Sequence, residues 1–510
     1  MNNKRWVRVL MGTMLTSGLL VSACAPKAAD PAAGKEPAAK GAEPSAAPSA
    51  GPVSITMARA GSPSAIPKED FVKKELDAKL GINFKLDLTD DKEHANKLSV
   101  LAASQNLPDL LEIKEKDLSV YYQMARNGLL LDLTPYLDKL GAVKKQVGEE
   151  GFTKGKVDGK VFGFSQAPRI VPQGFWIRKD WLDKLGLKPP TTMDELLEVA
   201  KAFTEKDPDG NGKKDTYGIS GTRETERGFL GAHGTTEPNK FYIQDGKLIN
   251  SLYDPNMKKG IEEFQRFLKA GVVDPELFTN KVADVTDKAA KGFAGIFYEQ
   301  WAGLVRDEHV KKMKEINPNA ELVLLPALQG AKNIRFNDVG QITAIIAIPK
   351  KLEKDPEKLA KVFELLNYVS DGDGANLVYY GQKDVHWKKE GEKIVLTEKK
   401  GEASYTWLYQ LTGRPEMDYL MTKFPPQAQL IKESSSLPEL KVYNGFVIPP
   451  KGFNVTDANR FIGEEMLKFY TGKAKLEEYD AFLGSLEKTF NFKGYLDEAD
   501  KTLKGLGYVK

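Results

Sequence analysis

Alternation between two hydrophobic periods constrains the fold of this chain more than any other feature of its sequence. Residues 53–58 and 82–88 alternate apolar and polar side chains with the period of two that a half-buried strand requires. Residues 71–80 instead follow a helical period that ends at Gly81, and the same succession of helix and strand continues up to residue 113. Strands that alternate with helices favour an α/β domain with a largely parallel sheet.

The rest of the chain adds a hairpin, more helices and a few strands. Asp158-Gly159 between two short apolar segments predicts a tight hairpin turn. A helical period over 178–185 ends at Gly186, and Thr192 with Glu195 forms the pattern of a capping box before the next helix. Strand patterns return in three segments: 295–297, 321–325 and 342–348.

The N-terminus has the three zones of an export signal. Lys4, Arg5 and Arg8 give it a positive start, and the apolar run that follows is shorter than the roughly 20 residues that span a bilayer. Small residues then lead directly to Cys24, the pattern of a lipobox. We therefore predict a signal peptide at 1–23 and lipidation of the Cys24 sulfur. The alternative is an ordinary signal peptide beside a chance cysteine.

The segment after this signal has no capacity to form a core. Residues 24–52 are almost entirely Ala, Pro, Gly and Ser, so they have little apolar surface to bury. We predict a proline-stiffened tether with a reach of roughly 30–50 Å. Cys24 is also the only cysteine in the chain, which excludes an internal disulfide and a cysteine-based metal site.

The charge balance argues against a polyanionic partner. The chain has 74 Lys and Arg residues against 71 Asp and Glu, and loss of Lys4, Arg5 and Arg8 with the signal peptide makes the two numbers equal. Nucleic-acid-binding proteins carry a marked basic excess or patch, so we expect no nucleic-acid partner. No later apolar run is long enough to cross a bilayer, and we expect everything beyond Cys24 to lie outside the cell.

Residues 207–218 match most of a twelve-residue calcium loop of the EF-hand type. Gly212 stands at position 6, where the sharp turn requires glycine, but Gly218 replaces the bidentate glutamate of position 12. The oxygen ligands that remain are Asp207, Asp209, Asn211, the carbonyl of Lys213, and Asp215. We predict one structural calcium ion in this loop. The alternative is a polar turn without a metal.

The central block carries a resemblance to a known family. Residues 175–192, FWIRKDWLDKLGLKPPTT, and the calcium-like loop after them resemble bacterial extracellular solute-binding proteins of the carbohydrate-type lipoprotein branch. Residues 157–161, 379–381 and 386–387 are similar to further signposts of that family. The resemblance implies an α/β fold of two lobes, like the type II periplasmic binding proteins. It also implies a hinge and a ligand cleft between the lobes.

The same resemblance implies how the chain is divided. We expect an N-terminal lobe of residues 53–168 with 292–345 and a C-terminal lobe of residues 169–291 with 346–510. The expected crossings between the lobes lie at 165–174, 291–297 and 340–349.

A sugar site needs aromatic platforms and planar polar groups, and several such residues fall near the expected crossings. Trp176 and Trp301 each follow a crossing, and Trp387 and Trp407 lie in the C-terminal part, where they are further candidates for the cleft. Core packing is the alternative for each tryptophan. The polar candidates for binding hydroxyls or a uronate, which have a solvated or structural role as their alternative, are Arg169, Gln173, Glu299, Asn337 and Asp338.

The family resemblance implies that the chain captures a carbohydrate, and specifically an oligosaccharide, as a monomer on the outer face of the cytoplasmic membrane. It implies delivery of that solute to the permease subunits of an ABC importer. A peptide or another small solute is the alternative ligand, and a glycan-active enzyme is a weaker alternative. The sequence lacks the GxSxG and HExxH motifs and the GxxxxGK[ST] phosphate loop. Its four histidines, at positions 94, 233, 309 and 386, lack metal-ligand spacing.

Overall fold

The computed structural model describes residues 51–333 and 335–510. The predicted signal peptide, Cys24 and nearly all of the predicted tether lie outside the described residues. In the part of the chain that is described, no helix has the length and apolar character needed to span a membrane.

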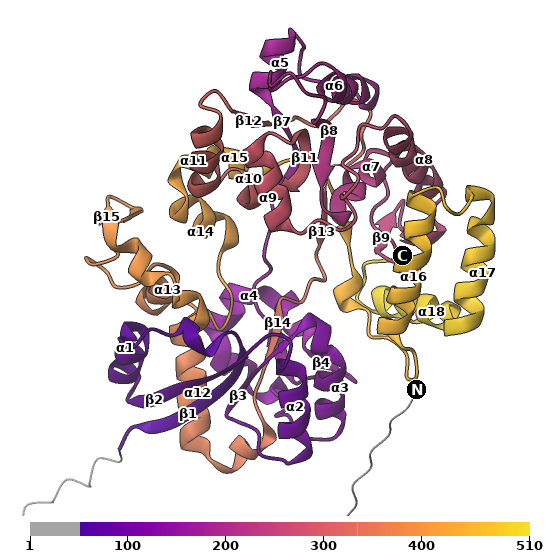
Figure 1. Ribbon diagram of the computed structural model, residues 1–510. Helices are drawn as coiled ribbons and strands as arrows, with labels where there is room; N and C mark the ends of the chain where they lie inside the picture. Colours follow the sequence, from indigo (N-terminus) through magenta and orange to yellow (C-terminus); the bar gives the residue numbers. More distant parts are fainter. Residues whose placement is uncertain (1–50, 334) are drawn as a thin grey trace, which may run out of the picture. The chain divides into compact units, whose positions relative to one another are not determined.

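The first lobe is built on a five-stranded sheet in the order β2-β1-β3-β14-β6 (Figure 1). Its parallel part joins β1 to β2 and β3, which confirms the α/β prediction, and β14 pairs antiparallel with both β3 and β6. The bounds of its strands are Val53–Ala60 for β1, Ile82–Thr89 for β2, Leu110–Lys114 for β3, Gly163–Ser165 for β6 and Ala344–Ala347 for β14.

Local sequence explains where the helices of this lobe begin and end. Helix α1, Phe71–Leu80, begins where the Asp70 carboxylate accepts a hydrogen bond from the Lys73 amide, and it ends at Gly81 with φ of 65°. Its Leu76 and Leu80 pack into the core of the lobe. The other helices are α2 His94–Ala103, α3 Leu118–Arg126, α4 Gly141–Lys154, α12 Pro356–Tyr368 and α13 Gly372–Tyr380. Two short hairpins complete the lobe: β4 Lys156–Val157 with β5 Lys160–Val161, and β15 Trp387–Glu390 with β16 Lys393–Leu396.

The second lobe contains two four-stranded sheets. One has the order β12-β7-β11-β8, and the other has the order β10-β9-β17-β13. The strands of the first are β7 Gln173–Arg178, β8 Tyr217–Gly221, β11 Ala294–Gln300 and β12 Leu322–Leu324. Those of the second are β9 Phe241–Gln244, β10 Lys247–Asn250, β13 Arg335–Asp338 and β17 Glu439–Val442.

Helices cover both faces of the β12-β7-β11-β8 sheet, so every residue of β7 is buried. The shorter helices of the lobe are α5 Lys179–Leu185, α7 Glu226–Ala232, α9 Val282–Lys291, α10 Trp301–Leu304, α11 Asp307–Ile316, α14 Glu416–Lys423 and α15 Ala428–Ser435. The longer ones are α6 Met193–Glu205, α8 Pro255–Lys269, α16 Val455–Tyr470, α17 Tyr479–Phe490 and α18 Phe492–Gly505.

The chain passes between the two lobes at three places. Residues 166–172 connect β6 to β7, residues 339–343 connect β13 to β14, and residues 410–415 lead from the first lobe into α14. The first lies within the predicted crossing at 165–174 and the second overlaps the predicted crossing at 340–349, whereas the third was not predicted.

The predicted assignment of residues 292–345 to the first lobe is wrong for most of that segment. Strand β11 pairs antiparallel with β7 and parallel with β8, so it belongs to the second lobe and makes no crossing at 291–297. Only β14, at the end of the segment, enters the first sheet, and the chain then stays in the first lobe through α12 and α13. The predicted assignment of residues 346–510 to the C-terminal lobe is therefore wrong for the part that precedes the 410–415 crossing. An apolar strand pattern shows that a strand is buried but not which sheet completes its hydrogen bonds, which explains the error.

Candidate functional site

The three crossings meet beside the carboxyl ends of β1 and β3 and form a small polar pocket. We call it the arginine pocket; its lining residues are Arg59, Gln166, Ala167, Arg169, Thr343, Gln410, Gly413 and Arg414. In open α/β sheets, ligands bind outside the carboxyl ends of the strands, where neighbouring connections diverge. The position of this pocket is therefore the one in which the fold class places a ligand site.

Arg59 is the most deeply buried charge of the pocket, with 3% of its surface exposed. It lies near the end of β1, and its Nη2 is 3.2 Å from Oε1 of Glu112 on the adjacent strand β3. Glu112 Oε2 accepts a hydrogen bond of 3.1 Å from the Ala60 amide. The Nε and Nη1 groups of Arg59 are buried and have no hydrogen-bond acceptor among the described residues. A buried donor without an acceptor costs free energy, so these two groups mark unused binding capacity.

The other two arginines of the pocket differ in their pairing. Arg414 donates from Nε and Nη2 to the two carboxylate oxygens of Glu416, at 2.6 and 2.9 Å. Arg169 is solvent-exposed and forms no ion pair within the described part of the chain. Desolvation by its neighbours, followed by repulsion from Arg414 and Arg59, lowers the pKa of Arg169. The pocket thus holds one guanidinium group without a carboxylate partner.

Trp407 is the only predicted tryptophan contact that lies beside this pocket. Its ring is half-buried, and its centroid is 5.8 Å from the Arg59 guanidinium carbon. Arg59 Nη2 also lies 3.5 Å from the backbone oxygen of Trp407. The ring therefore offers an apolar surface next to a positively charged group, the combination that a sugar ring with an acidic substituent requires.

The other three predicted tryptophan contacts are core residues, so their proposed role in the cleft is corrected. Trp176 on β7 has 0% exposure, and its indole N–H donates to the backbone oxygen of Glu299 at 2.9 Å. Trp301 is buried with its ring 5.0 Å from that of Phe424. Trp387 is buried, and its N–H donates to the Gly381 oxygen at 2.8 Å. Packing in the core therefore accounts for the positions of all three tryptophans.

The remaining predicted polar contacts lie in the second lobe, away from the lining of the arginine pocket. Gln173 and Glu299 are buried in the β7–β11 pair. Burial raises the pKa of Glu299 to about 7, although its Oε1 accepts a hydrogen bond of 2.8 Å from the Gln300 amide. Asn337 and Asp338 are half-buried on β13, and Asn337 Nδ2 is 3.4 Å from Glu439 Oε1. Of the predicted contacts, Arg169 lines the arginine pocket and Trp407 contacts Arg59 of that pocket.

Asp338 belongs to a second group of charges, near the 339–343 crossing. Burial, opposed mainly by the charge of Lys240 and reinforced by that of Glu115, raises the pKa of Asp338 to about 6. Its Oδ1 is buried without a hydrogen-bond donor among the described residues. Lys154, at the end of α4, donates instead to the Gln341 oxygen at 3.1 Å. This group contains acidic and basic residues, whereas the charged residues that line the arginine pocket are all arginines.

The main pocket residues that the sequence analysis missed are Arg59, Glu112 and Arg414. A signal for two of them was present. Arg59 and Glu112 each interrupt a strongly apolar strand segment, and a charge in a buried strand needs a partner of opposite sign. No pattern near Arg414 indicated that it lies on a crossing.

The calcium-like loop brings its acidic side chains together around Asn211. Asn211 Nδ2 lies 2.8 Å from Asp209 Oδ2 and 3.1 Å from Asp215 Oδ1. Asp207 accepts from the amides of Gly210 and Gly212, each at 3.0 Å. Its hydrogen bond with Asp209 lowers the pKa of Asp207, whereas desolvation and that same bond raise the pKa of Asp209. Carboxyl groups this close to one another fit a loop that a cation would stabilise.

The loop also differs from a complete calcium site. A Cβ at Gly218 would lie 2.4 Å from the backbone oxygen of Ala200 in α6, so packing excludes any side-chain ligand at that position. Within residues 51–333 and 335–510, no group of three or more His, Cys, Asp or Glu side chains is arranged to hold a metal ion. Asn211, the carbonyl of Lys213 and solvent would have to complete the coordination.

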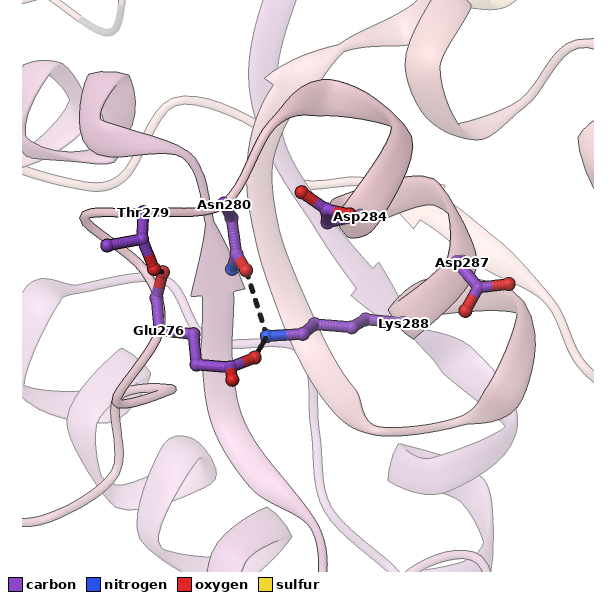
Figure 2. A pocket seen from close by; sticks show the side chains of 6 residues that line it. All are labelled: Glu276, Thr279, Asn280, Asp284, Asp287 and Lys288. Carbon is purple, nitrogen blue, oxygen red and sulfur yellow. Dashed lines mark hydrogen bonds and ion pairs between the residues drawn. The ribbon is translucent and has the colours of Figure 1, made fainter. Parts of the chain in front are cut away.

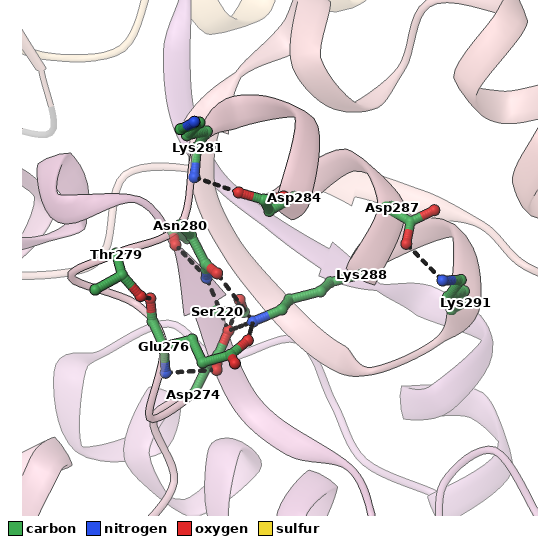
Figure 3. Close-up of polar contacts among 11 residues, drawn as sticks. Ser220, Asp274, Glu276, Thr279, Asn280, Lys281, Asp284, Asp287, Lys288 and Lys291 are labelled. Carbon is green, nitrogen blue, oxygen red and sulfur yellow. Dashed lines mark hydrogen bonds and ion pairs between the residues drawn. The ribbon is translucent and has the colours of Figure 1, made fainter.

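A second polar hollow lies in the second lobe around the Lys288 ammonium group (Figure 2). Lys288 Nζ is 2.7 Å from Asp274 Oδ2, 2.7 Å from Glu276 Oε2 and 3.0 Å from Asn280 Oδ1. The two other acidic groups of the hollow are paired as well, because Asp284 accepts from the Lys281 amide at 2.8 Å and Asp287 lies 2.7 Å from Lys291 (Figure 3). This hollow is a saturated ion-pair network, and nothing in it calls for a ligand.

Comparison with known proteins places the chain in a family. A model of the family "Bacterial extracellular solute-binding protein" matches residues 64–375. Lipoprotein LipO of Bacillus subtilis is 27% identical over 354 residues, which cover 65% of this chain and 69% of the relative. The polygalacturonan/rhamnogalacturonan-binding protein YtcQ of Bacillus subtilis is 28% identical over 346 residues, with 66% and 67% coverage.

Solved structures support the same fold. Alginate-binding protein AlgQ2 without calcium ion superposes with a TM-score of 0.66 at 19% identity and covers 89% of this chain and 98% of its own. FusA, a substrate-binding protein of a Streptococcus pneumoniae ABC transporter, in complex with kestose has a TM-score of 0.63 at 19% identity, with 89% and 99% coverage. These likenesses confirm the two-lobed fold. The family match confirms the prediction of a binding protein rather than an enzyme: the chain belongs to the bacterial extracellular solute-binding proteins.

Proposed function

We propose that this protein captures an oligosaccharide outside the cell and delivers it to the permease of an ABC importer. The observation that carries the proposal is the arginine pocket, where three interlobe crossings meet beside buried donors that have no acceptor among the described residues. Relatives that are named for their ligands bind carbohydrates, among them polygalacturonan and fructooligosaccharide. Closure of two lobes about their crossings is the usual way in which such a site encloses a ligand.

The mechanism follows from the position of the pocket on the crossings. A ligand held there contacts residues on either side of the segments that must bend when the lobes move. Contacts that form only in the closed arrangement shift the population toward that arrangement, by as much as the ligand's difference in affinity for the two. The permease then distinguishes the loaded protein from the empty one by its shape.

A panel of oligosaccharides and peptides, screened by thermal shift and followed by calorimetry, tests this function. An oligosaccharide present at about 100 times its Kd stabilises the folded protein by about 2.7 kcal/mol and raises its Tm. Stabilisation by peptides alone, with no response to any oligosaccharide, contradicts the proposal. Hydrolysis of a bound glycan would contradict the assignment as a binding protein.

We further propose that Cys24 carries the lipid that holds the protein on the outer face of the membrane, where it acts as a monomer. Support comes from the lipobox pattern and from the similarity to a named lipoprotein. Cys24→Ala should move the protein from the membrane fraction to the medium. Full retention of this variant in the membrane fraction contradicts the anchor.

A structural calcium ion in the 207–215 loop is a separate proposal, supported by the convergence of Asp207, Asp209 and Asp215 around Asn211. A chelator should lower the Tm, added calcium should restore it, and Asp207→Ala should abolish this response. An identical melting curve with and without the chelator contradicts the proposal and favours a polar turn.

A further inference from the structure

We propose that the arginine pocket binds an acidic group of the carbohydrate, so that the ligand is an anionic oligosaccharide of the uronate type. This inference rests on the proposed function and names the class of sugar that the same site accepts. Four features of the pocket carry it: its charge, its free donors, its aromatic neighbour and the close approach of two of its crossings.

The charge of the pocket is not balanced from within. Arg59 pairs with Glu112, and Arg414 pairs with Glu416, which leaves the guanidinium group of Arg169 as the third positive charge against two negative ones. Desolvation and repulsion from Arg414 and Arg59, opposed by the charges of Glu416 and Glu112, lower the pKa of Arg169, which lines the same pocket as the other two arginines. A carboxylate in the pocket relieves this repulsion, whereas a neutral sugar leaves it in place.

The free donors lie on the most deeply buried of the three arginines. The Nη2 group of Arg59 is fixed by Glu112, and the chain around it is a buried strand, so Nε and Nη1 keep their positions before a ligand arrives. Their rigid placement reduces the entropy that binding must offset. A carboxylate accepts hydrogen bonds from ionised donors more strongly than a hydroxyl does.

The side-chain amides of the pocket are already used to shape it. Gln166 Nε2 donates to the backbone oxygens of Gln410 and Leu411, at 3.2 and 3.0 Å, and Gln410 Nε2 donates to Val378 at 3.0 Å. These bonds tie two crossings together, and the donors of the pocket that remain without an acceptor among the described residues are those of Arg59 and the Thr343 hydroxyl. The half-buried ring of Trp407 beside Arg59 then supplies a surface for the sugar ring that carries the acid.

Gly413 allows two of the crossings to pack closely against each other at the pocket. Its φ is 83°, and a Cβ at this position would lie 2.7 Å from the Ala167 amide nitrogen. Only glycine therefore allows the 410–415 crossing to approach the 166–172 crossing this closely. The close approach brings Arg414 and Arg169 to the same pocket.

The test compares two forms of one sugar, a charged acid and its uncharged ester. Calorimetry measures the Kd of the purified protein for trigalacturonate and for its methyl ester, at about pH 7. We expect the acid to bind about 10-fold to 100-fold more tightly than the ester. Raising the salt from about 50 mM to about 300 mM should weaken binding of the acid more than binding of the ester.

Variants assign this preference to the pocket. Arg169→Gln should bring the ratio of the two Kd values close to one, while Arg460→Gln, which changes an exposed arginine on α16, should keep the wild-type ratio. A thermal melt of each variant without ligand checks that Arg169→Gln is folded, and Arg169→Lys should restore part of the preference because the positive charge is kept.

The outcomes separate this inference from the proposed function. Equal affinity for acid and ester, or a preference that Arg169→Gln leaves intact, overturns the inference and leaves an oligosaccharide-binding protein. Binding of an acidic peptide, with no binding of any charged or neutral oligosaccharide, overturns both.

Discussion

The two polar hollows of this protein are both lined by charged groups but differ in how far the hydrogen-bonding capacity of those groups is satisfied. Around Lys288, all three donors of the ammonium group have oxygen acceptors at 2.7–3.0 Å. In the arginine pocket, Arg59 keeps two buried donors without acceptors, and Arg169 has no ion-pair partner among the described residues. The comparison teaches that a charged hollow indicates a binding site only where its hydrogen-bonding capacity remains unused. Where that capacity is filled, the charges hold the fold together.

The largest effect is expected from separating the buried pair of Arg59 and Glu112. Arg59→Met leaves the Glu112 carboxylate buried without its partner, which should lower the free energy of unfolding by about 3–5 kcal/mol. Adding Glu112→Gln should recover most of this loss, because the neutral amide oxygen still accepts from the Ala60 amide. Urea unfolding of the two variants measures the difference. Equal destabilisation by the single and the double change would contradict a buried ion pair.

A smaller loss of stability is expected when the ammonium group of Lys288 is removed from the saturated hollow. Lys288→Met removes three hydrogen bonds but leaves Asp274 with Ser220 and Asn280, at 2.6 and 2.9 Å. The free energy of unfolding should fall by about 1–3 kcal/mol, with the Kd for an oligosaccharide unchanged. The matched control Lys291→Met breaks an exposed pair and should cost less than about 0.5 kcal/mol. A changed Kd in Lys288→Met would place the ligand at this hollow and reverse the comparison.

The smallest expected effect is a pH dependence of the stability that the Lys288 network contributes. Against the opposing effect of burial, the hydrogen bonds of Lys288 and Ser220 lower the pKa of Asp274. Its contribution to stability is therefore present above the unfolded pKa, near 3.9, and is lost as the pH falls through the lower folded value. The difference in unfolding free energy between wild type and Lys288→Met should be constant between about pH 6 and about pH 8. It should shrink below about pH 4. A difference that grows on acidification would contradict the assigned pairing.

The parts of the fold that the sequence predicted are those in which neighbouring residues decide the structure. Asp70 and Gly81 bound α1 as the capping pattern indicates, and Asp158-Gly159 adopts the positive φ angles of a tight hairpin turn. Even in these parts, the sequence did not predict every side-chain contact. Thr192 accepts from the Glu195 amide as predicted, but the Glu195 carboxylate turns to Thr191 rather than completing the capping box.

The parts that the sequence did not predict depend on contacts between distant residues. The partner strands of β11 are β7 and β8, and nothing in residues 294–300 distinguishes them from β14 or β3. The same holds for the tryptophans. Trp176 and Trp407 have the same side chain, yet Trp176 is enclosed by helices on both sides of its sheet. Trp407 instead lies just before the 410–415 crossing, beside Arg59. Arg59 becomes interpretable only once Glu112, 53 residues further on, lies on the neighbouring strand.

A crystal structure of the protein with trigalacturonate tests the central claim most directly. The account predicts a sugar carboxylate within hydrogen-bonding distance, about 2.7–3.2 Å, of Arg59 Nε or Nη1 and of the Arg169 guanidinium group, with the sugar ring against Trp407. It also predicts that Lys288 keeps its three partners in that complex. A bound sugar that leaves the Arg59 donors unpaired, or that displaces the Lys288 network instead, would contradict the account.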